Sequence, residues 1–162
     1  MKKIALTILL LSAMAALAQV TAANPARASV PAIYQKWVSD DVAYIIAPAE
    51  RRAFTGLKDD AERDEFVRQF WLRRDPTPGT EENEFKEEHY RRIAYANVHF
   101  ASKLPGWKTD RGRVYIVQGP PDEITAGKNS VGASREIWRY KKSDDTAIFE
   151  DHCKCGEFEQ VK

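Results

Sequence analysis

The segment from Gly106 to Asp122 constrains the fold of this chain more than any other. A polar, turn-rich stretch, residues 106 to 113, leads directly into the apolar run Val114-Tyr115-Ile116-Val117, and Gly119-Pro120-Pro121-Asp122 then forms a second turn. Side chains around the run alternate with a period of two, which is the pattern of a β-strand. We therefore expect a strand over residues 113 to 118, held between two turns.

Two helices are expected before this strand. Asp59 and Glu62 form a capping-box-like start, and aromatic residues then recur at a spacing of four, which predicts a helix over residues 60 to 73 that ends at Asp75-Pro76. A second helix should begin with Thr80 as its N-cap and continue to about Ser102. Its buried face would carry Phe85, His89, Ile93, Ala96 and Phe100.

The remaining pattern favours strands. Residues 37 to 46 mix aromatic and β-branched side chains and stop at Pro48, which favours an extended segment. Further strands are expected at Glu136–Tyr140, Ala147–Glu150 and Phe158–Val161, and residues 125 to 133 should form a flexible, exposed loop. Helices followed by strands indicate an α+β domain in which two helices pack on a small antiparallel β-sheet.

The N-terminus has the features of a secretory signal. Two lysines precede a short apolar run, and the small residues Ala16 and Ala18 suit cleavage after Ala18, with a second site after Ala23 and an uncleaved anchor as alternatives. This predicts a signal peptide over residues 1–18, a disordered leader over 19–35 and one domain over 36–162. The protein would then be secreted or periplasmic, and it would contact the membrane only through the signal peptide.

Charge excludes one class of partner. Loss of Lys2 and Lys3 with the signal would leave 23 basic against 24 acidic residues, so the mature chain would carry a net charge of about −1. Nucleic-acid-binding domains carry a basic patch or stripe, which this composition does not suggest. We expect no nucleic-acid partner.

Four residues at the first turn, Gly106, Trp107, Thr109 and Asp110, carry a resemblance to a known family. Together with the block Phe70 to Thr80 they make the chain similar to the GWxTD domain, a module of secreted bacterial proteins. The resemblance covers roughly Trp37 to Gln118 and implies a fold and a compartment but no established activity. It extends loosely to the C-terminal part, where relatives are expected to have glycines and acids in place of the cysteines.

The candidate binding residues lie at two turns. Trp107 offers a large amphipathic ring, with Asp110 and Arg111 beside it, and Arg73, Arg74 and Asp75 could form a notch for a carboxylate or phosphate. The alternative is structural: the GWxTD residues would shape a tight corner, and Arg74 would pair with Asp75, Asp110 or Glu84.

Catalytic and metal sites are not indicated. The carboxylates near His89 lack the helical spacing of a zinc pair, and Glu87–Arg91 and Glu88–Arg92 suit exposed ion pairs instead. We predict no catalytic residue, no metal and no cofactor. A competing hypothesis is a hydrolase that acts on glycans or peptides through Asp75, Glu84 or Asp110.

The two cysteines allow several readings. Cys153 and Cys155 could form a local disulfide, bond to other chains, remain free, or bind a metal together with His152. Bonding to other chains would suit a structural protein of the cell envelope.

The function expected from the sequence is therefore a secreted or periplasmic, non-catalytic interaction module. It would bind another envelope or secreted protein, or a glycan, through the turn that contains Trp107 and the adjacent loop.

Overall fold

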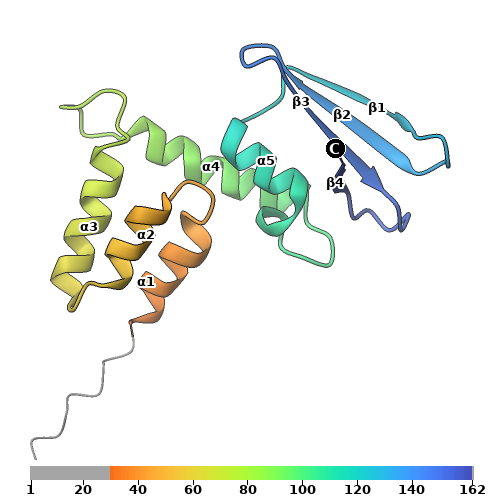
Figure 1. Ribbon diagram of the computed structural model, residues 1–162. Coiled ribbons are helices and arrows are strands. Elements are labelled where there is room, and N and C mark those ends of the chain that lie inside the picture. Colours follow the sequence, from red (N-terminus) through yellow and green to blue (C-terminus); the bar gives the residue numbers. More distant parts are fainter. Residues whose placement is uncertain (1–29, 162) are drawn as a thin grey trace, which may run out of the picture. The chain divides into compact units, whose positions relative to one another are not determined.

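Helices precede strands along the chain, as the sequence predicts, and the fold is α+β. The computed structural model describes residues 30 to 161 (Figure 1). The helical elements are α1 (Ala32–Lys36), a π-helical turn η1 (Trp37–Asp41), α2 (Pro48–Thr55), α3 (Asp60–Leu72), α4 (Glu84–His99), a 3₁₀ turn η2 (Gly106–Lys108) and α5 (Asp110–Gln118). The strands are β1 (Glu123–Lys128), β2 (Ser134–Tyr140), β3 (Asp145–Asp151) and β4 (Glu159–Val161).

Two hydrophobic clusters stabilise these elements. The N-terminal core contains Trp37, Val42, Ile46, Phe54, Phe70 and Trp71. The sheet core contains Ala96, Phe100, Val114, Ile116, Trp138, Tyr140, Ala147 and Phe149. Helix α4 contributes to both, because Tyr90 packs against the first cluster and Ala96 belongs to the second, together with Phe100 directly after the helix.

The arrangement expected for the two helices needs correction. Helix α3 supplies Phe70 and Trp71 to the N-terminal core rather than to the sheet. The helices that pack on the sheet are α4 and α5, and the ring of Phe100 lies 5.4 Å from that of Trp138.

The expected extended segment over residues 37 to 46 is wrong. Trp37–Asp41 is a π-helical turn in which the amide of Val42 donates to the carbonyl of Trp37 at 3.0 Å. This coiled conformation turns Trp37, Val42 and Ile46 into the same core. Pro48 does not end a strand but begins α2. At the first position of a helix the backbone N–H has no partner within the helix, so a proline there loses no hydrogen bond.

The two expected helices are confirmed, but both ends of the second lie elsewhere than predicted. The Asp59 side chain caps α3 by accepting a hydrogen bond from the Glu62 amide at 2.9 Å. Helix α4, however, is capped by Asn83 rather than Thr80, and it ends at His99. Asn83 also donates to the Trp71 carbonyl at 2.8 Å, so its amide links the start of α4 to the end of α3.

Residues 113 to 118 are helical, so the strand expected there is wrong. The β-branched run favours a strand locally, but Thr109 caps the helix and Asp110 lies in its first turn, where a negative charge is favourable. At the other end Arg92 donates to the carbonyls of Ile116 and Val117, at 3.3 and 3.5 Å. Capping at both ends and burial in the sheet core together outweigh strand propensity.

The sheet is an antiparallel meander in the order β1-β2-β3-β4. Strands β2, β3 and β4 confirm three expected strands, whereas β1 and the turn after it replace the flexible loop expected over residues 125 to 133. Asn129 orders that turn: its side-chain oxygen accepts from the amides of Val131 and Ala133, and its side-chain amide donates to Glu150 at 2.8 Å.

The expected signal peptide and most of the leader lie outside the described residues. Within the described part, α1 already begins at Ala32, inside the segment expected to be a disordered leader. No helix among residues 30 to 161 is long and apolar enough to cross a membrane.

Candidate functional site

Gly106 allows η2 to approach helix α4 closely. A Cβ atom at this position would lie 1.8 Å from the carbonyl oxygen of Ala96, which is far inside van der Waals contact. Gly112 allows the same close approach between α5 and η2, because a Cβ atom there would lie 1.9 Å from the carbonyl oxygen of Gly106. The backbones of α4, η2 and α5 are therefore packed against one another at these two glycines.

Thr109 joins η2 to α5 through its hydroxyl group. The hydroxyl donates to the Gly106 carbonyl at 2.8 Å and accepts from the Gly112 amide at 3.1 Å. Both bonds are buried, so loss of the hydroxyl would remove the cap from the Gly112 amide, while the Gly106 carbonyl would keep its bond from the Thr109 amide at 3.2 Å. A threonine is thus required both as an N-cap and as a link to the preceding turn.

Asp110 connects α5 to the edge of the sheet. Its carboxylate accepts from the backbone amide of Gln160 in β4 at 2.8 Å and from Arg113 at 3.3 Å. Arg113 also donates to the side chain of Gln160 at 2.8 Å. The outer edge of β4 is therefore held by the first turn of α5.

Trp107 is half-buried and engaged through its backbone and its ring. Its amide donates to the Asn97 side chain at 3.1 Å, and its carbonyl accepts from the Tyr44 hydroxyl at 3.1 Å. The Tyr44 ring meets the indole edge-on at 6.0 Å, and the Lys108 ammonium lies 4.9 Å from the ring centroid. These contacts connect the turn before α2 to the corner formed by η2 and α5.

The adjacent arginine, Arg111, faces the sheet core rather than solvent. Its side chain is 14% exposed, pairs with Glu136 at 3.1 Å and lies over the ring of Phe158 at 4.1 Å. Glu136 also accepts from the indole N–H of Trp138 at 3.0 Å. Arg111 therefore orders polar groups next to the sheet core.

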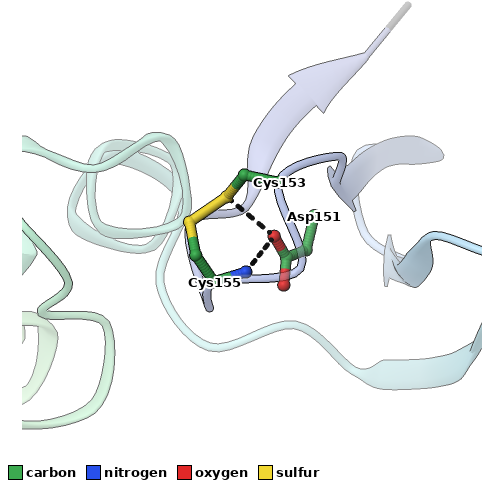
Figure 2. Close-up of side chains that lie close together, drawn as sticks. All are labelled: Asp151, Cys153 and Cys155. Carbon is green, nitrogen blue, oxygen red and sulfur yellow. Dashed lines mark hydrogen bonds between the residues drawn. A yellow bond between two sulfur atoms is a disulfide. The ribbon is translucent and has the colours of Figure 1, made fainter.

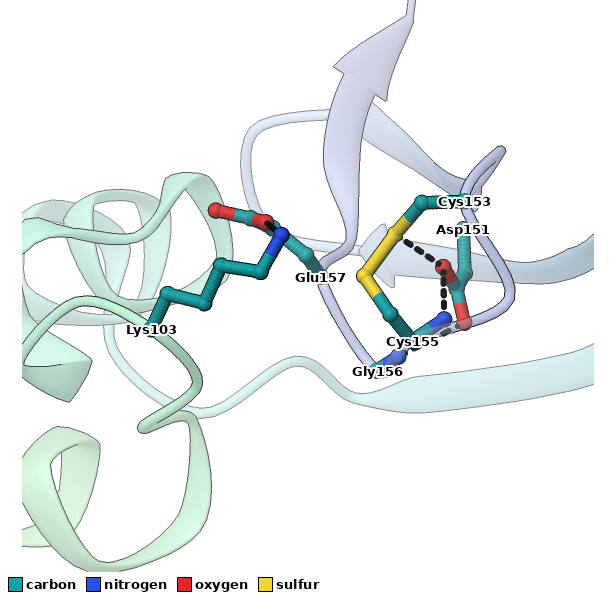
Figure 3. Close-up of a disulfide and its surroundings, with 6 residues drawn as sticks. All are labelled: Lys103, Asp151, Cys153, Cys155, Gly156 and Glu157. Carbon is teal, nitrogen blue, oxygen red and sulfur yellow. Dashed lines mark hydrogen bonds and ion pairs between the residues drawn. A yellow bond between two sulfur atoms is a disulfide. The ribbon is translucent and has the colours of Figure 1, made fainter.

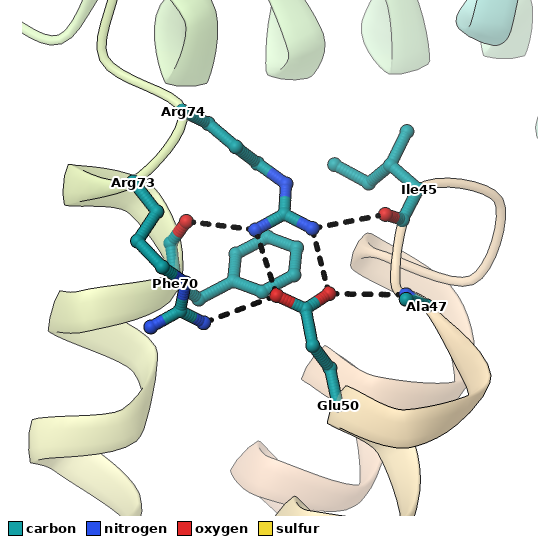
Figure 4. A network of polar contacts seen from close by, with 6 residues as sticks. All are labelled: Ile45, Ala47, Glu50, Phe70, Arg73 and Arg74. Atoms are coloured by element: carbon teal, nitrogen blue, oxygen red, sulfur yellow. Dashed lines mark hydrogen bonds and ion pairs between the residues drawn. The ribbon is translucent and has the colours of Figure 1, made fainter.

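The two arginines directly after α3 bind the carboxylate of Glu50, a pairing that the sequence did not predict. Arg74 forms a bidentate ion pair with Glu50 of α2, at 2.7 and 3.1 Å (Figure 4). Arg73 donates a third hydrogen bond to the Glu50 carboxylate, at 3.0 Å. The Ala47 amide also donates to Glu50 at 3.0 Å. These donors, Arg74 first, lower the pKa of Glu50 from 4.5 to about 2.

The expected partners of Arg74 were wrong. Asp75 instead accepts from the Thr77 amide at 3.0 Å and shapes the turn after α3. The Arg74 guanidinium lies 3.6 Å from the ring centroid of Phe70 and donates to the carbonyls of Phe70 and Ile45. The notch expected for a carboxylate or phosphate is thus filled by Glu50 from the same chain.

The corner with Gly106, Trp107, Thr109 and Asp110 is the feature by which the family is named. The sequence model of the GWxTD domain matches residues 13–159. The chain belongs to the GWxTD domain family. No curated protein and no solved structure matches the chain.

In this GWxTD domain the carboxylates proposed for hydrolysis lie on three different elements. Asp75 follows α3, Glu84 is the first residue of α4 and Asp110 is the first residue of α5. Asp75 and Asp110 each accept a backbone hydrogen bond, at 3.0 and 2.8 Å.

Cys153 and Cys155 form a disulfide in the turn between β3 and β4 (Figure 2). The carboxylate of Asp151, which is 5% exposed, lies 3.2 Å from the Cys153 sulfur. It accepts from the amides of Cys155 and Gly156 at 3.1 and 2.9 Å. Among the described residues, these three side chains are the one group with the spacing of a metal site, and both sulfurs are already bonded to each other.

His89 is a core residue of the domain. It is 4% exposed, and its Nε2 lies 2.6 Å from the Asp41 carbonyl at the end of η1. A carbonyl only accepts, so Nε2 carries the proton. Burial lowers the pKa of His89, which keeps the ring neutral at neutral pH.

Two roles were not predicted from the sequence: the pairing of Glu50 with the arginines of α3, and the capping of α5 by Arg92, for which only the confirmed pair with Glu88 was expected. A signal for Glu50 did exist, because Pro48 followed by an acid two residues later is typical of a helix start. Arg92 pairs with Glu88 at 2.8 Å and caps α5, and Gly119 leaves room for its guanidinium. Its role depends on α5 being a helix, which the strand-like pattern concealed.

Proposed function

We propose that this GWxTD domain is a secreted, non-catalytic interaction module. It binds an extended segment of another secreted or envelope protein along the β1 edge, meaning the edge of Glu123–Lys128 that faces away from β2, and at the hairpin tip formed by residues 129 to 132. The observation that carries this proposal is the difference between the two edges of the sheet.

The two edge strands are treated differently by the rest of the fold. At β4 the amide of Gln160 is bonded to Asp110 of α5. Strand β1 pairs with β2 alone among the described residues, and all six of its residues are exposed. An edge strand with unpaired backbone groups is a template for a strand from another chain.

The geometry identifies the backbone groups that would bind. Asn129 donates to the Ala133 carbonyl at 2.9 Å, which makes this a hydrogen-bonded pair of the β1–β2 ladder. Bonded and non-bonded pairs alternate in antiparallel ladders. The amide of Ala126, three residues earlier, therefore points away from β2 and is available to a partner.

Side chains next to this edge favour a partner segment with apolar residues. Ile124 is 54% exposed and Val131, at the hairpin tip, is 78% exposed. In an added strand, alternate side chains would contact Ile124 on one face of the sheet. Backbone bonds would supply affinity and this apolar contact would supply selectivity.

The other candidate binding residues serve the fold. Trp107, Asp110 and Arg111 hold α5 against the rest of the domain, and Arg73 and Arg74 hold α2 against α3. The β1 edge and the hairpin tip, residues 123 to 132, follow α5 in the sequence. They are the part of the expected binding surface that remains open to a partner.

The secreted compartment is proposed on two features. The N-terminal residues have the pattern of a secretory signal. The Cys153–Cys155 disulfide is of the kind that persists in oxidising compartments and is rare in the cytosol.

The hydrolase hypothesis is less well supported. A hollow beside the motif is lined by Asp110, Glu157 and Glu159, among others. Two of these acids are engaged, however: Asp110 binds the Gln160 amide, and Glu157 pairs with Lys103 at 3.6 Å. A general acid needs a group free to exchange its proton with a substrate, so this hollow favours a structural role.

The proposal is tested by photo-crosslinking in cells of the producing bacterium, with the probe at Val131 and either alanine or proline at position 126. Proline at 126 removes an outward amide while leaving the bonds to β2 in place. We expect a discrete adduct with alanine and its loss with proline, while the two proteins show the same thermal unfolding. An adduct that persists with proline, or a probe at Glu87 of α4 giving the same adduct, would contradict binding at the β1 edge. An adduct between two copies of the chain would also contradict it, by identifying a homodimer contact instead.

A further inference from the structure

The disulfide turn is the part of the molecule whose chemistry the proposed function does not use. Cys153 and Cys155 are the two cysteines of the chain, and both are exposed. Exposed disulfides are accessible to attack by thiolates of other molecules, whereas buried structural disulfides are not.

The disulfide bond contributes little to the stability of the turn, which other contacts already hold in place. A disulfide stabilises a fold by closing a loop in the unfolded chain, and a loop of sequence separation 2 is among the shortest that a disulfide can close. The turn is held independently: Asp151 accepts from the Cys155 and Gly156 amides, and Glu157 pairs with Lys103 after α4 (Figure 3). The two ends of the turn, at Asp151 and at Gly156–Glu157, should therefore stay in place when the bond opens, whereas Lys154 between the cysteines can change its conformation.

The small ring also imposes a backbone cost. Lys154, between the two cysteines, has φ of 54°, in the left-handed region that a non-glycine residue rarely adopts. Opening the ring frees this residue to return to an ordinary conformation. This favours the dithiol form, so the disulfide is a better oxidant than one whose ring leaves the backbone in an ordinary conformation.

We propose that Cys153–Cys155 is a thiol–disulfide exchange site that accepts two electrons and two protons from a dithiol of another protein. A thiolate of the partner attacks the Cys153 sulfur, the bond between the two sulfurs breaks, and the electron pair leaves on Cys155. The partner's second thiolate then attacks its own sulfur in the mixed disulfide and releases Cys153. The partner ends as a disulfide, and both cysteines of this chain end as thiols after taking up the partner's two protons.

Asp151 decides the direction of attack. Its carboxylate lies 3.2 Å from the Cys153 sulfur, so a negative charge on Cys153 is disfavoured and a thiol there can donate a hydrogen bond. Cys155 is then the better leaving group of the two, and in the reduced protein it is the more reactive thiolate. The site acts once per chain unless another molecule reoxidises it, and it is independent of binding at the β1 edge.

The first test equilibrates the folded mature protein with mixtures of reduced and oxidised glutathione and counts free thiols by alkylation and mass spectrometry. We expect reduction in glutathione alone with an unchanged circular dichroism spectrum. Lys154→Gly, which relieves the left-handed residue, should raise the ratio [GSH]²/[GSSG] at half-reduction about fivefold. A disulfide that resists glutathione until the protein unfolds, or a midpoint that Lys154→Gly leaves unchanged, would overturn the proposal.

The second test uses the reduced protein and a limiting amount of iodoacetamide. We expect faster alkylation of Cys155 than of Cys153, and Asp151→Asn should remove most of this difference. Equal rates in the unsubstituted protein would contradict the assigned direction. A Cys153→Ser/Cys155→Ser double variant should unfold at nearly the same temperature as the parent and should not oxidise a reduced model dithiol peptide; marked loss of stability would make the bond structural and overturn the proposal.

Discussion

Replacing Glu50 by glutamine tests the junction between α2 and α3. Glutamine keeps the size and one acceptor oxygen of the side chain but removes the charge that Arg73 and Arg74 bind. The guanidinium of Arg74, whose side chain is 19% exposed, would lose its ionic partner. We expect a large loss of stability because partly buried, two-pronged pairs are stronger than exposed ones.

The magnitude follows from the pKa of Glu50. The pKa is lowered from 4.5 to about 2, and each unit corresponds to about 1.4 kcal/mol of interaction in favour of the charged form. The charged carboxylate therefore contributes about 3 kcal/mol to the free energy of unfolding at pH 7. Since glutamine can still accept one bond, we expect E50Q to lose about 2–3 kcal/mol at neutral pH.

The pH dependence has a definite sign. The folded protein binds fewer protons at Glu50 than the unfolded chain does, so this contribution is complete above the unfolded pKa of 4.5 and is lost as pH falls toward about 2. At pH 3 the difference in stability between the parent and E50Q should be less than half of its value at pH 7.

Urea denaturation of both proteins at pH 7 and pH 3 measures these differences. Glu65 provides the matched control, because its pKa is also lowered to about 2, mainly by Arg68, while its side chain is 55% exposed. Glu65→Gln should change stability much less, as is usual for exposed pairs. An E50Q effect no larger than that of the control, or one that does not change with pH, would refute the reasoning.

Three further predictions concern the core and the corner. Gly106→Ala should lower the free energy of unfolding by more than about 3 kcal/mol in urea denaturation, because its Cβ would meet the Ala96 carbonyl, whereas Gly127→Ala, with open space around it, should have little effect. Asp110→Ala should increase hydrogen exchange at the Gln160 amide at least tenfold in NMR measurements, and unchanged protection there would disprove the link between α5 and β4. Because burial lowers the pKa of His89, the unfolded chain binds its proton more readily, and thermal stability should fall as pH drops below about 6.5; His89→Gln should reduce this part of the pH dependence.

The sequence identified the elements whose local signals and tertiary environment agree. Helix α3 has both a capping residue, Asp59, and a periodic apolar face, and strands β2 and β3 alternate between the sheet core and the other face of the sheet. Strand β1 was missed because all of its residues are exposed, so no alternation marks it, and its conformation depends on pairing with β2. Helix α5 was missed because its β-branched run favours a strand until caps from Thr109 and Arg92 are taken into account.

In the candidate site, too, local features were predictable from the sequence and long-range contacts were not. Gly106, Thr109 and Asp110 are residue types that shape turns, so the sequence alone predicts this local role. Their long-range partners could not be read, since Asp110 binds a residue 50 positions away and the Trp107 carbonyl binds one 63 positions away. Asp75, Glu84 and Asp110 are the partners that the sequence suggests for Arg74, because no local signal links it to Glu50, 24 positions earlier.

The residues of the GWxTD motif hold α4, η2 and α5 together, and replacing Thr109 by valine measures this role through a single hydroxyl group. Valine has nearly the shape of threonine but lacks the hydroxyl that binds Gly106 and Gly112, whereas Thr55→Val removes an exposed hydroxyl that donates to the Arg52 carbonyl and serves as control. Urea denaturation should show that T109V loses about 2 kcal/mol, with an unchanged dependence on urea concentration, and that T55V loses much less. A T109V protein as stable as its parent would contradict this structural role and would make the motif a binding site for a partner instead.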